Sequence, residues 1–340
     1  MVLLYEELSG QPSALRDMAA YYRERADLLD FPSAQAGYPW VLTGMGASYH
    51  AAWIGALAFG SFGLPVQAIE TVDLIHYSRL PETGGWTVYV SQSGSSGEVN
   101  PFFEHIPARG RLAALTNTPD SDLARRAERV LPMCAGEENL IASKTFINSL
   151  GILWMLARKV AGASDGQEFS RLEEVADRAG DIFASAETLR ERFQAFYDPA
   201  FPLLFLGHGP HAATARQAAM GMSEWAKVPA LNAGLGAFRH GFIESVRPGL
   251  RVVMFAPPGK TQASALGLAR ELDEYGAKIL LVENGQLRGL EEKSKAGSDI
   301  DEFLSPLLDI LPVQIAADWL VRSSGIEPGF RYISKVVRQL

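Results

Sequence analysis

Short runs of apolar residues alternate along this chain with longer segments in which apolar residues recur every three or four positions. Apolar runs without polar alternation are typical of parallel strands that are covered on both faces, and the segments between them of crossover helices. We therefore expect an α/β fold in which parallel sheets are flanked by helices. The predicted strands are 40–43, 86–90, 112–116, 203–206 and 252–255, and the predicted helices include 11–29, 51–59 and 212–222.

The two halves of the chain repeat one pattern. The first predicted strand runs into Gly44 and Gly46, and the fourth runs into Gly207 and Gly209, 163 positions later in both cases. The simplest explanation is two tandem copies of one doubly wound unit. We predict an N-terminal helix plus a first domain over 1–160, a charged helical connector over 161–195, and a second domain over 196–340.

Composition and charge narrow the classes of partner. The chain has 340 residues, of which 47% are hydrophobic and 21% charged, as in ordinary globular proteins. Its net charge of −8 argues against nucleic acid or an anionic membrane as a partner, because both attract basic surfaces. A small anion remains possible, since backbone N–H groups, hydroxyls and helix N-termini can hold one.

Cysteine usage and the N-terminus bear on location and cofactors. Cys134 is the only cysteine, which excludes a disulfide framework within the chain and a cysteine metal cluster. Residues 1–18 lack the pattern of a signal peptide, and no apolar run approaches the roughly 18 residues that a membrane span needs. We expect a cytoplasmic protein without a bound metal or cofactor.

A loop rich in hydroxyls follows the second predicted strand. Residues 91–98 read SQSGSSGE, whereas residues 256–262 of the second half read APPGKTQ. The first loop is either a solvated turn in which Ser96 caps a helix or a site for an anion such as phosphate. Ser48, which follows the first strand, would face the same crevice. The position of the loop after a buried strand favours phosphate, bound in the first half only.

Other candidate groups are weaker when each is taken alone. The Gly44-x-Gly46 fragment lacks the third glycine of a dinucleotide-binding motif, and the chain has no ATPase phosphate loop. His208 and His211 are spaced as a possible metal pair, although a loop or capping role fits them better. Glu224 and His240 are candidate acid–base groups, but they also fit a solvated helix carboxylate and a turn histidine.

Several stretches together resemble the sugar isomerase (SIS) family, most closely the tandem-SIS isomerase domain of glucosamine-6-phosphate synthase and its stand-alone relatives. They occur in the family order over nearly the whole chain beyond the first helix. These stretches are GMGASYHAA, SQSGSSGE, CAGEENLIASKTF, FLGHGP, SEWAKVPALNAGLGAFRHGF and RYISKVVRQL.

The resemblance implies roles for individual residues. Glu224 matches the carboxylate that moves a proton between C1 and C2, and His240 the ring-opening histidine that reaches the neighbouring subunit's site. Lys335 matches the lysine near the C-terminus that closes over the sugar. The implied phosphate-binding residues are Ser48, Ser91, Gln92, Ser93 and Ser96, and the implied sugar-binding residues are Gly46, Ile141 and Ser143.

Departures from the pattern limit what the resemblance implies. Ala47 replaces a hydroxyl residue, Gly221 stands where the synthase has a lysine, and Lys144-Thr145 inverts the usual order. No glutaminase segment precedes the match, so we do not expect the synthase reaction.

The resemblance implies a homodimeric, metal-independent isomerase for an amino-sugar or hexose 6-phosphate, most concretely a glucosamine-6-phosphate deaminase/isomerase. A deglycase for an amine-conjugated sugar phosphate and a non-catalytic phosphosugar sensor are the alternatives. We also expect Ile333, Val336 and Val337 to anchor the tail and bring Lys335 to the site.

Overall fold

A computed structural model describes residues 4–33, 38–105, 111–294, 300–327 and 329–338. The chain forms two compact units. The first unit comprises Gly10–Ala176 with Arg331–Leu340, and the second comprises Met1–Ser9 with Asp177–Phe330. The cut falls inside one helix of the predicted connector, and the last ten residues group with the first half. The predicted domain boundaries stay predictions.

The first unit is built on a five-stranded parallel sheet with the strand order β2-β1-β3-β4-β5. This order reverses direction between β1 and β3, which is where doubly wound sheets bind ligands at the carboxyl ends of their strands. The strands are β1 (Trp40–Gly44), β2 (Val66–Glu70), β3 (Trp86–Ser91), β4 (Arg111–Thr116) and β5 (Arg129–Pro132).

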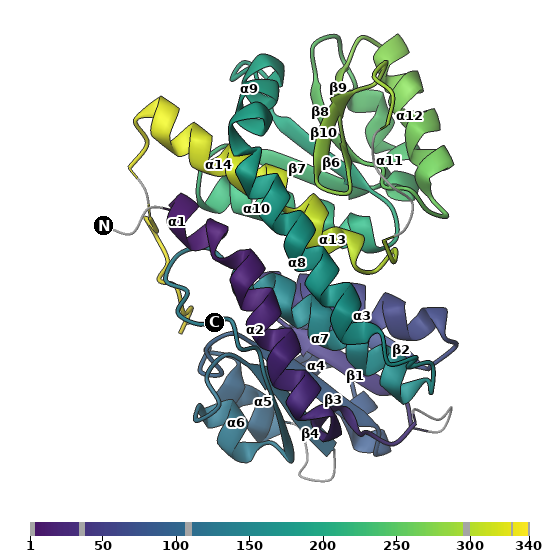
Figure 1. The fold of residues 1–340 in the computed structure, drawn as a ribbon, viewed down its shortest axis with the longest axis vertical. Helices are drawn as coiled ribbons and strands as arrows, with labels where there is room; N and C mark the ends of the chain where they lie inside the picture. Colours follow the sequence, from purple (N-terminus) through teal and green to yellow (C-terminus); the bar gives the residue numbers. More distant parts are fainter. Residues whose placement is uncertain (1–3, 34–37, 106–110, 295–299, 328, 339–340) are drawn as a thin grey trace. The chain divides into compact units, whose positions relative to one another are not determined.

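Helices cover both faces of this sheet. One face carries α3 and α7, with α2 packed on α7, as Figure 1 shows. On the other face, residues of α4, α5 and α6 form one apolar cluster with Val41, Tyr89 and Leu112 of the sheet. The elements are α2 (Gln11–Glu24), η1 (Ala26–Leu29), α3 (Ala47–Ser61), α4 (Thr71–Tyr77), η2 (Leu80–Thr83), α5 (Val99–His105), α6 (Asp122–Arg126) and α7 (Lys144–Val160).

The second unit repeats this topology. Its sheet has the order β10-β9-β8-β6-β7, which is the first order read from the other edge, and only β10 runs antiparallel to its neighbour. Two parallel-dominated sheets confirm the predicted fold class. The strands are β6 (Leu203–Gly207), β7 (Ala230–Gly234), β8 (Arg251–Phe255), β9 (Lys278–Glu283) and β10 (Gln286–Gly289).

The helices of the second unit also lie on both faces of its sheet. Leu235 and Phe238 of α11 and Leu268 of α12 pack on one face of the sheet, while α10 contacts β6 and β7. Helix α8 (Glu168–Ala184) spans the boundary between the units. The other elements are α1 (Leu4–Ser9), α9 (Ala186–Phe196), α10 (Pro210–Glu224), α11 (Leu235–Arg239), η3 (Phe242–Ser245), α12 (Gln262–Glu274), α13 (Ser305–Asp309) and α14 (Leu311–Ser324).

Several element boundaries differ from the sequence prediction. The first predicted helix ends at Glu24 and continues as the separate turn η1, and the helix expected over 51–59 begins at Ala47. Strands β2, β5, β7, β9 and β10 were not predicted. The edge strands β2 and β7 lack the continuous apolar run of a central strand, because their residues are only partly buried or exposed. Strand β9 does carry such a run and was missed.

No helix in the described part of the chain is long and apolar enough to cross a membrane.

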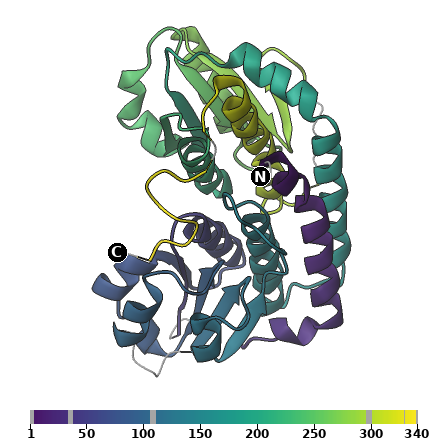
Figure 2. The same ribbon diagram turned by 90° about the vertical axis from the view of Figure 1, so that its left-hand side faces the viewer.

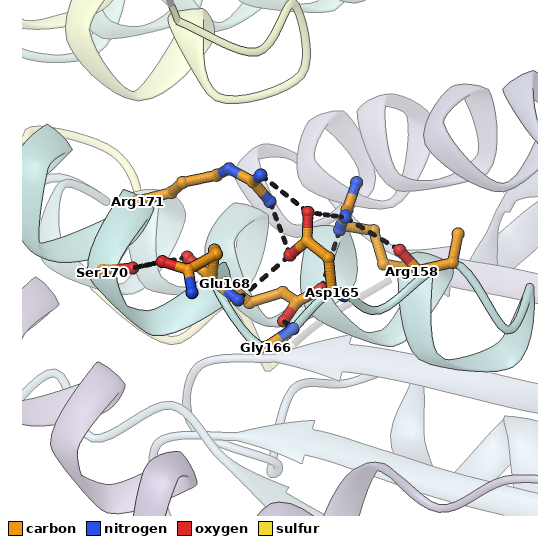
Figure 3. Close-up of polar contacts among 8 residues, drawn as sticks. Arg158, Asp165, Gly166, Glu168, Ser170 and Arg171 are labelled. Carbon is orange, nitrogen blue, oxygen red and sulfur yellow. Dashed lines mark hydrogen bonds and ion pairs between the residues drawn. The ribbon is translucent and has the colours of Figure 1, made fainter.

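An ion cluster fixes the connection between α7 and α8 in the first unit (Figure 3). Arg158 contacts Glu168 at 3.0 Å and Asp165 at 3.1 Å, and Arg171 contacts Asp165 at 2.7 Å. The hydrogen bond from Arg171 and the backbone N–H of Gln167 lower the pKa of Asp165 to about 2. Burial opposes ionisation of Glu168, but hydrogen bonds from Arg158 and the backbone outweigh it, so its pKa is also lowered.

We predict that Arg158→Met lowers the free energy of unfolding by about 2 kcal/mol at pH 7, because Glu168 would stay buried without its counterion. Because the pKa of Glu168 is lowered in the folded state, its contribution to stability is fully present above the ordinary value of 4.5 and is lost as the pH falls below it. The difference between variant and wild type should therefore shrink over that range. Urea titrations at several pH values measure it, and a difference that is constant down to pH 2 would contradict the assignment.

Arg171→Met serves as the control for this prediction. Arg171 pairs with Asp165 near the surface, where an ion pair contributes little, so we expect a much smaller loss at pH 7.

Candidate functional site

The carboxyl ends of β1 and β3 meet at a glycine. A Cβ atom at Gly44 would lie 2.8 Å from the Cβ of Ser48 and 2.8 Å from the carbonyl oxygen of Val90. Only a residue without a side chain allows this approach. The structure therefore brings Ser48, in the first turn of α3, next to the point where β3 passes into the serine loop (residues 91–98). Gly46, at φ 53°, is the residue before this helix.

The serine loop is folded by its own hydroxyl groups. Ser91 Oγ accepts the Gly94 N–H at 3.1 Å, and Ser93 Oγ accepts the Ser95 N–H at 3.2 Å. A hydroxyl whose oxygen accepts a backbone N–H keeps its hydrogen as its own donor. Gly94 has φ 58°, and a Cβ there would lie 2.1 Å from Ser121 Oγ, so this tight turn requires glycine.

The loop is also tied to the next strand. The carbonyl oxygen of Gln92 accepts the Asn117 N–H at 3.1 Å, and the carbonyl oxygen of Ser96 accepts the Val99 N–H at the start of α5. These bonds hold the predicted phosphate-binding residues at one edge of the first sheet. These residues come from the end of β3, the serine loop and the start of α3.

Ile141 and Ser143 lie in a second loop at this edge, residues 134–143, and both are buried at 3% and 0% exposure. The Ser143 hydroxyl donates to Glu138 Oε1 at 3.2 Å. Asn117 ties this loop to the end of β4, because its side chain accepts the Ala135 N–H at 2.9 Å and donates to the Gly136 carbonyl oxygen at 2.7 Å. In this conformation the Ser143 hydroxyl donates its hydrogen to Glu138, a residue of the same loop.

The C-terminal segment, residues 331–338, joins both loops. Figure 2 shows it in yellow, running to the purple and blue part of the chain. Lys335 Nζ lies 3.1 Å from Glu138 Oε2 and also donates to the Leu140 carbonyl oxygen. The Val337 carbonyl oxygen accepts the Gly97 N–H of the serine loop at 2.9 Å. Lys335 is thus placed beside the loop of Ile141 and Ser143.

The tail is not anchored as the sequence suggested. Ile333 and Val337 are 52% and 42% exposed, so they do not dock into an apolar surface, and of the three expected anchors Val336 alone is half-buried. Main-chain hydrogen bonding and one ion pair hold the segment, and these contacts leave no signal in an apolar pattern. Gln339 and Leu340 lie outside the described residues.

In the second unit, the position that corresponds to Ser48 is occupied by His211, which is paired with Asp309. His211 follows Ser48 by 163 positions, and its side chain is 2% exposed. Its Nε2 lies 2.8 Å from Asp309 Oδ2, while Asp309 Oδ1 accepts the Gly285 N–H at 2.7 Å. At the place of the Ser48 hydroxyl, the second edge therefore has a buried His211–Asp309 pair.

The remaining predicted residues belong to the second unit. Glu224 is the last residue of α10 and is half-buried, and His240 follows α11 directly and is exposed. His240 lines an open depression of about 530 Å³ together with Phe242 and Glu244 of η3. The two residues thus stand in a different unit from the serine loop and Lys335.

Two residues near these positions were missed by sequence reasoning. Glu138 was hidden inside the matched stretch CAGEENLIASKTF, and only its burial singles it out. Lys227 adopts φ 57°, uncommon for a residue with a side chain, and its Nζ donates to the carbonyl oxygens of Glu224 and, at 2.6 Å, Gly329. No sequence pattern predicts the burial of Glu138 or the positive φ of Lys227.

Two other ionisable groups at the first edge are poor nucleophiles or bases. Burial raises the pKa of Tyr89 to about 12 and that of the Cys134 thiol to about 11. Both stay protonated near neutral pH. Among the described residues, no three His, Cys, Asp or Glu side chains gather in a way that could hold a metal ion.

Comparison with known proteins decides the family of the first half. The SIS domain family matches residues 40–159, which contain the serine loop and both glycines of the first turn. The chain carries a SIS domain. This SIS domain makes up most of the first unit, and the second unit repeats its strand order, in agreement with the predicted resemblance.

The chain is also similar to longer curated proteins. It is 24% identical over 331 residues to the glutamine–fructose-6-phosphate aminotransferase (isomerizing) of Methanothermobacter thermautotrophicus, covering 96% of this chain and 55% of the relative. The chain therefore spans little more than half the length of that relative.

Solved structures share the fold over nearly the full length. The C-terminal domain of glucosamine-fructose-6-phosphate aminotransferase from Francisella tularensis is similar at a TM-score of 0.84 and 16% identity, covering 96% of this chain and 98% of that one. The glucosamine-6-phosphate deaminase of Thermotoga maritima is similar at 0.80 and 21% identity, covering 98% and 99%. At these identities the likeness concerns the fold.

Proposed function

We propose that the protein is a phosphosugar isomerase that acts on an amino-sugar or hexose 6-phosphate. The observation that carries this is the asymmetry of the two sheet edges. The first edge offers the hydroxyl groups of the serine loop and Ser48 at the N-terminus of α3, whereas the second has APPGKTQ in place of that loop and the buried His211–Asp309 pair in place of Ser48. One phosphate monoester per chain fits this asymmetry.

In the proposed reaction, Glu224 takes a proton from one carbon of the open-chain sugar and returns it to the next. A carboxylate suits this task because it can both accept and donate the proton within one turnover. His240 assists ring opening from the neighbouring subunit of a homodimer, since imidazole exchanges protons near neutral pH. Lys335 stabilises the negative charge that develops on the enediol oxygen.

If the C2 substituent is an amine, isomerisation to the 2-imine and hydrolysis release ammonia. Glucosamine-6-phosphate deaminase/isomerase is thus the most concrete form of the proposal, and the similar fold of the Thermotoga maritima deaminase supports it. A deglycase for an amine-conjugated sugar phosphate would use the same proton transfer and differ in its leaving amine. A non-catalytic phosphosugar sensor would bind without turnover.

A panel of hexose and hexosamine 6-phosphates tests the proposal, with isomerisation and ammonia release scored separately. We expect turnover of a hexosamine 6-phosphate with ammonia as a product, and none with the unphosphorylated sugar. Release of a larger amine from a conjugate alone would favour the deglycase. Binding of sugar phosphates without any turnover would leave the sensor.

We predict that Ser93→Ala weakens binding of a hexose 6-phosphate by about 1.5 to 3 kcal/mol, the value of one hydrogen bond to a charged group. Pro258, 165 positions later in the second unit, provides the control. Pro258→Ala should leave the affinity unchanged in isothermal titration calorimetry. Equal losses in both variants would mean that phosphate binds at both sheet edges.

A further inference from the structure

Glu138 is a buried carboxylate with an unusual number of donors. Its side chain is fully buried, at 0% exposure. Oε1 accepts the Ser143 N–H at 2.9 Å, the Ser143 hydroxyl at 3.2 Å and the Thr145 N–H at 3.0 Å. Oε2 accepts the Thr145 hydroxyl at 2.7 Å and lies 3.1 Å from Lys335 Nζ. A buried charge is tolerated only when it is paired and hydrogen-bonded in this way.

These contacts give Glu138 two partners of different kinds. Ser143 and Thr145 stand at the N-terminus of the 17-residue helix α7, where the first N–H groups have no partner within the helix and a negative charge is favoured. Lys335 comes from the other end of the chain, 197 positions away. One carboxylate therefore links the start of α7 to the tail.

The tail has few other means of holding its place. Residues 331–338 form neither helix nor strand, and the side chain of Tyr332 is 95% exposed. The Gly97–Val337 hydrogen bond fixes one point, and Lys335 fixes the other through Glu138 and Leu140. Of these contacts, the ion pair alone brings together opposite charges away from water, where such attraction is strongest.

We propose that Glu138 is the positioning residue for Lys335, the residue whose charge holds the tail lysine at the loop of Ile141 and Ser143. The Glu138 carboxylate is fully buried and is fixed by four hydrogen bonds. It is therefore a rigid counterion that holds the Lys335 ammonium group at one position. This role deepens the proposed function, on which its catalytic consequence rests. The docking of the tail itself does not depend on that function.

Amide hydrogen exchange of residues 331–338 in the ligand-free protein tests the docking. Glu138→Gln keeps the size of the side chain and removes its charge, and we expect exchange of the tail to be about tenfold faster or more. Lys335→Met should give the same increase, and the double variant no further one, since both remove the same ion pair.

The neighbouring Glu137 provides a matched control. It is exposed, and its Oε1 accepts the Asn139 side-chain N–H at 2.9 Å. Glu137→Gln should leave exchange of the tail as in wild type. Tail exchange that is unchanged in Lys335→Met would overturn the proposal, and this result is obtainable even if Glu138→Gln does not fold.

A kinetic double-mutant cycle on hexosamine 6-phosphate tests the catalytic consequence. We expect Glu138→Gln to lower kcat with little change in KM, because the serine loop stays intact, and to have no further effect in the Lys335→Met background. An equal additional loss in that background would show that Glu138 acts on α7 alone. If wild type itself turns over no sugar phosphate while tail exchange responds as predicted, the proposed function fails and the role of Glu138 in docking stands.

Discussion

Glu224→Gln is expected to abolish turnover of the hexose or hexosamine 6-phosphate while leaving its binding intact. The amide keeps the shape of the side chain at the end of α10 but cannot take up the proton that must move between C1 and C2. Loss of a general base lowers the rate by about a hundredfold or more. Stopped assays measure the rate, and titration calorimetry measures the affinity.

Glu274 provides the matched control for this result. It is also the last residue of a helix in the second unit, and its side chain is exposed. Glu274→Gln should turn over like wild type. An unimpaired Glu224→Gln would remove Glu224 from the mechanism, whatever the outcome at the serine loop.

Deletion of residues 331–340 should lower turnover by about a hundredfold or more, the range seen when a group that stabilises an oxyanion is lost. The sheet and helices of the first unit lie within residues 10–176, so the truncated protein should keep its circular dichroism spectrum and its phosphate binding. Activity assays and calorimetry on the purified truncation test both parts.

Tyr332→Ala separates loss of the lysine from general disturbance of the tail. The side chain is 95% exposed, so the variant should behave as wild type in the same assays. A truncated enzyme that turns over normally would show that Lys335 has no catalytic role.

Strands β1, β3, β4, β6 and β8 and the serine loop were predictable from the sequence because their residues are close in the chain, although the central strand β9 was missed. An apolar run followed by SQSGSSGE describes β3 and its loop completely, and the matching glycines at 44 and 207 revealed the repeat. The identical offset to Ser48 and His211 also lay in the sequence. The pairing of His211 with Asp309 at the second edge could not be predicted, because the two residues are 98 positions apart in the chain.

The environment of Lys335 could not be predicted for the same reason. Its partner Glu138 looks like any acidic residue of a polar loop until its burial is known. The tail was expected to dock through apolar side chains, since apolar burial is the interaction that a pattern reveals. A single ion pair and a backbone hydrogen bond have no such signature.

The division of the chain into units has a consequence for protein synthesis. Residues 10–176 emerge from the ribosome before the whole of 177–330 has been made, and only then does the segment that carries Lys335 appear. At about 5–20 residues per second, the delay is on the order of ten seconds or more, long enough for a domain to fold on the ribosome. The serine loop of a nascent chain can therefore be folded before Lys335, the partner of Glu138, has been synthesised. Phosphate binding would mature during translation, and catalysis only after residues 331–338 have been added.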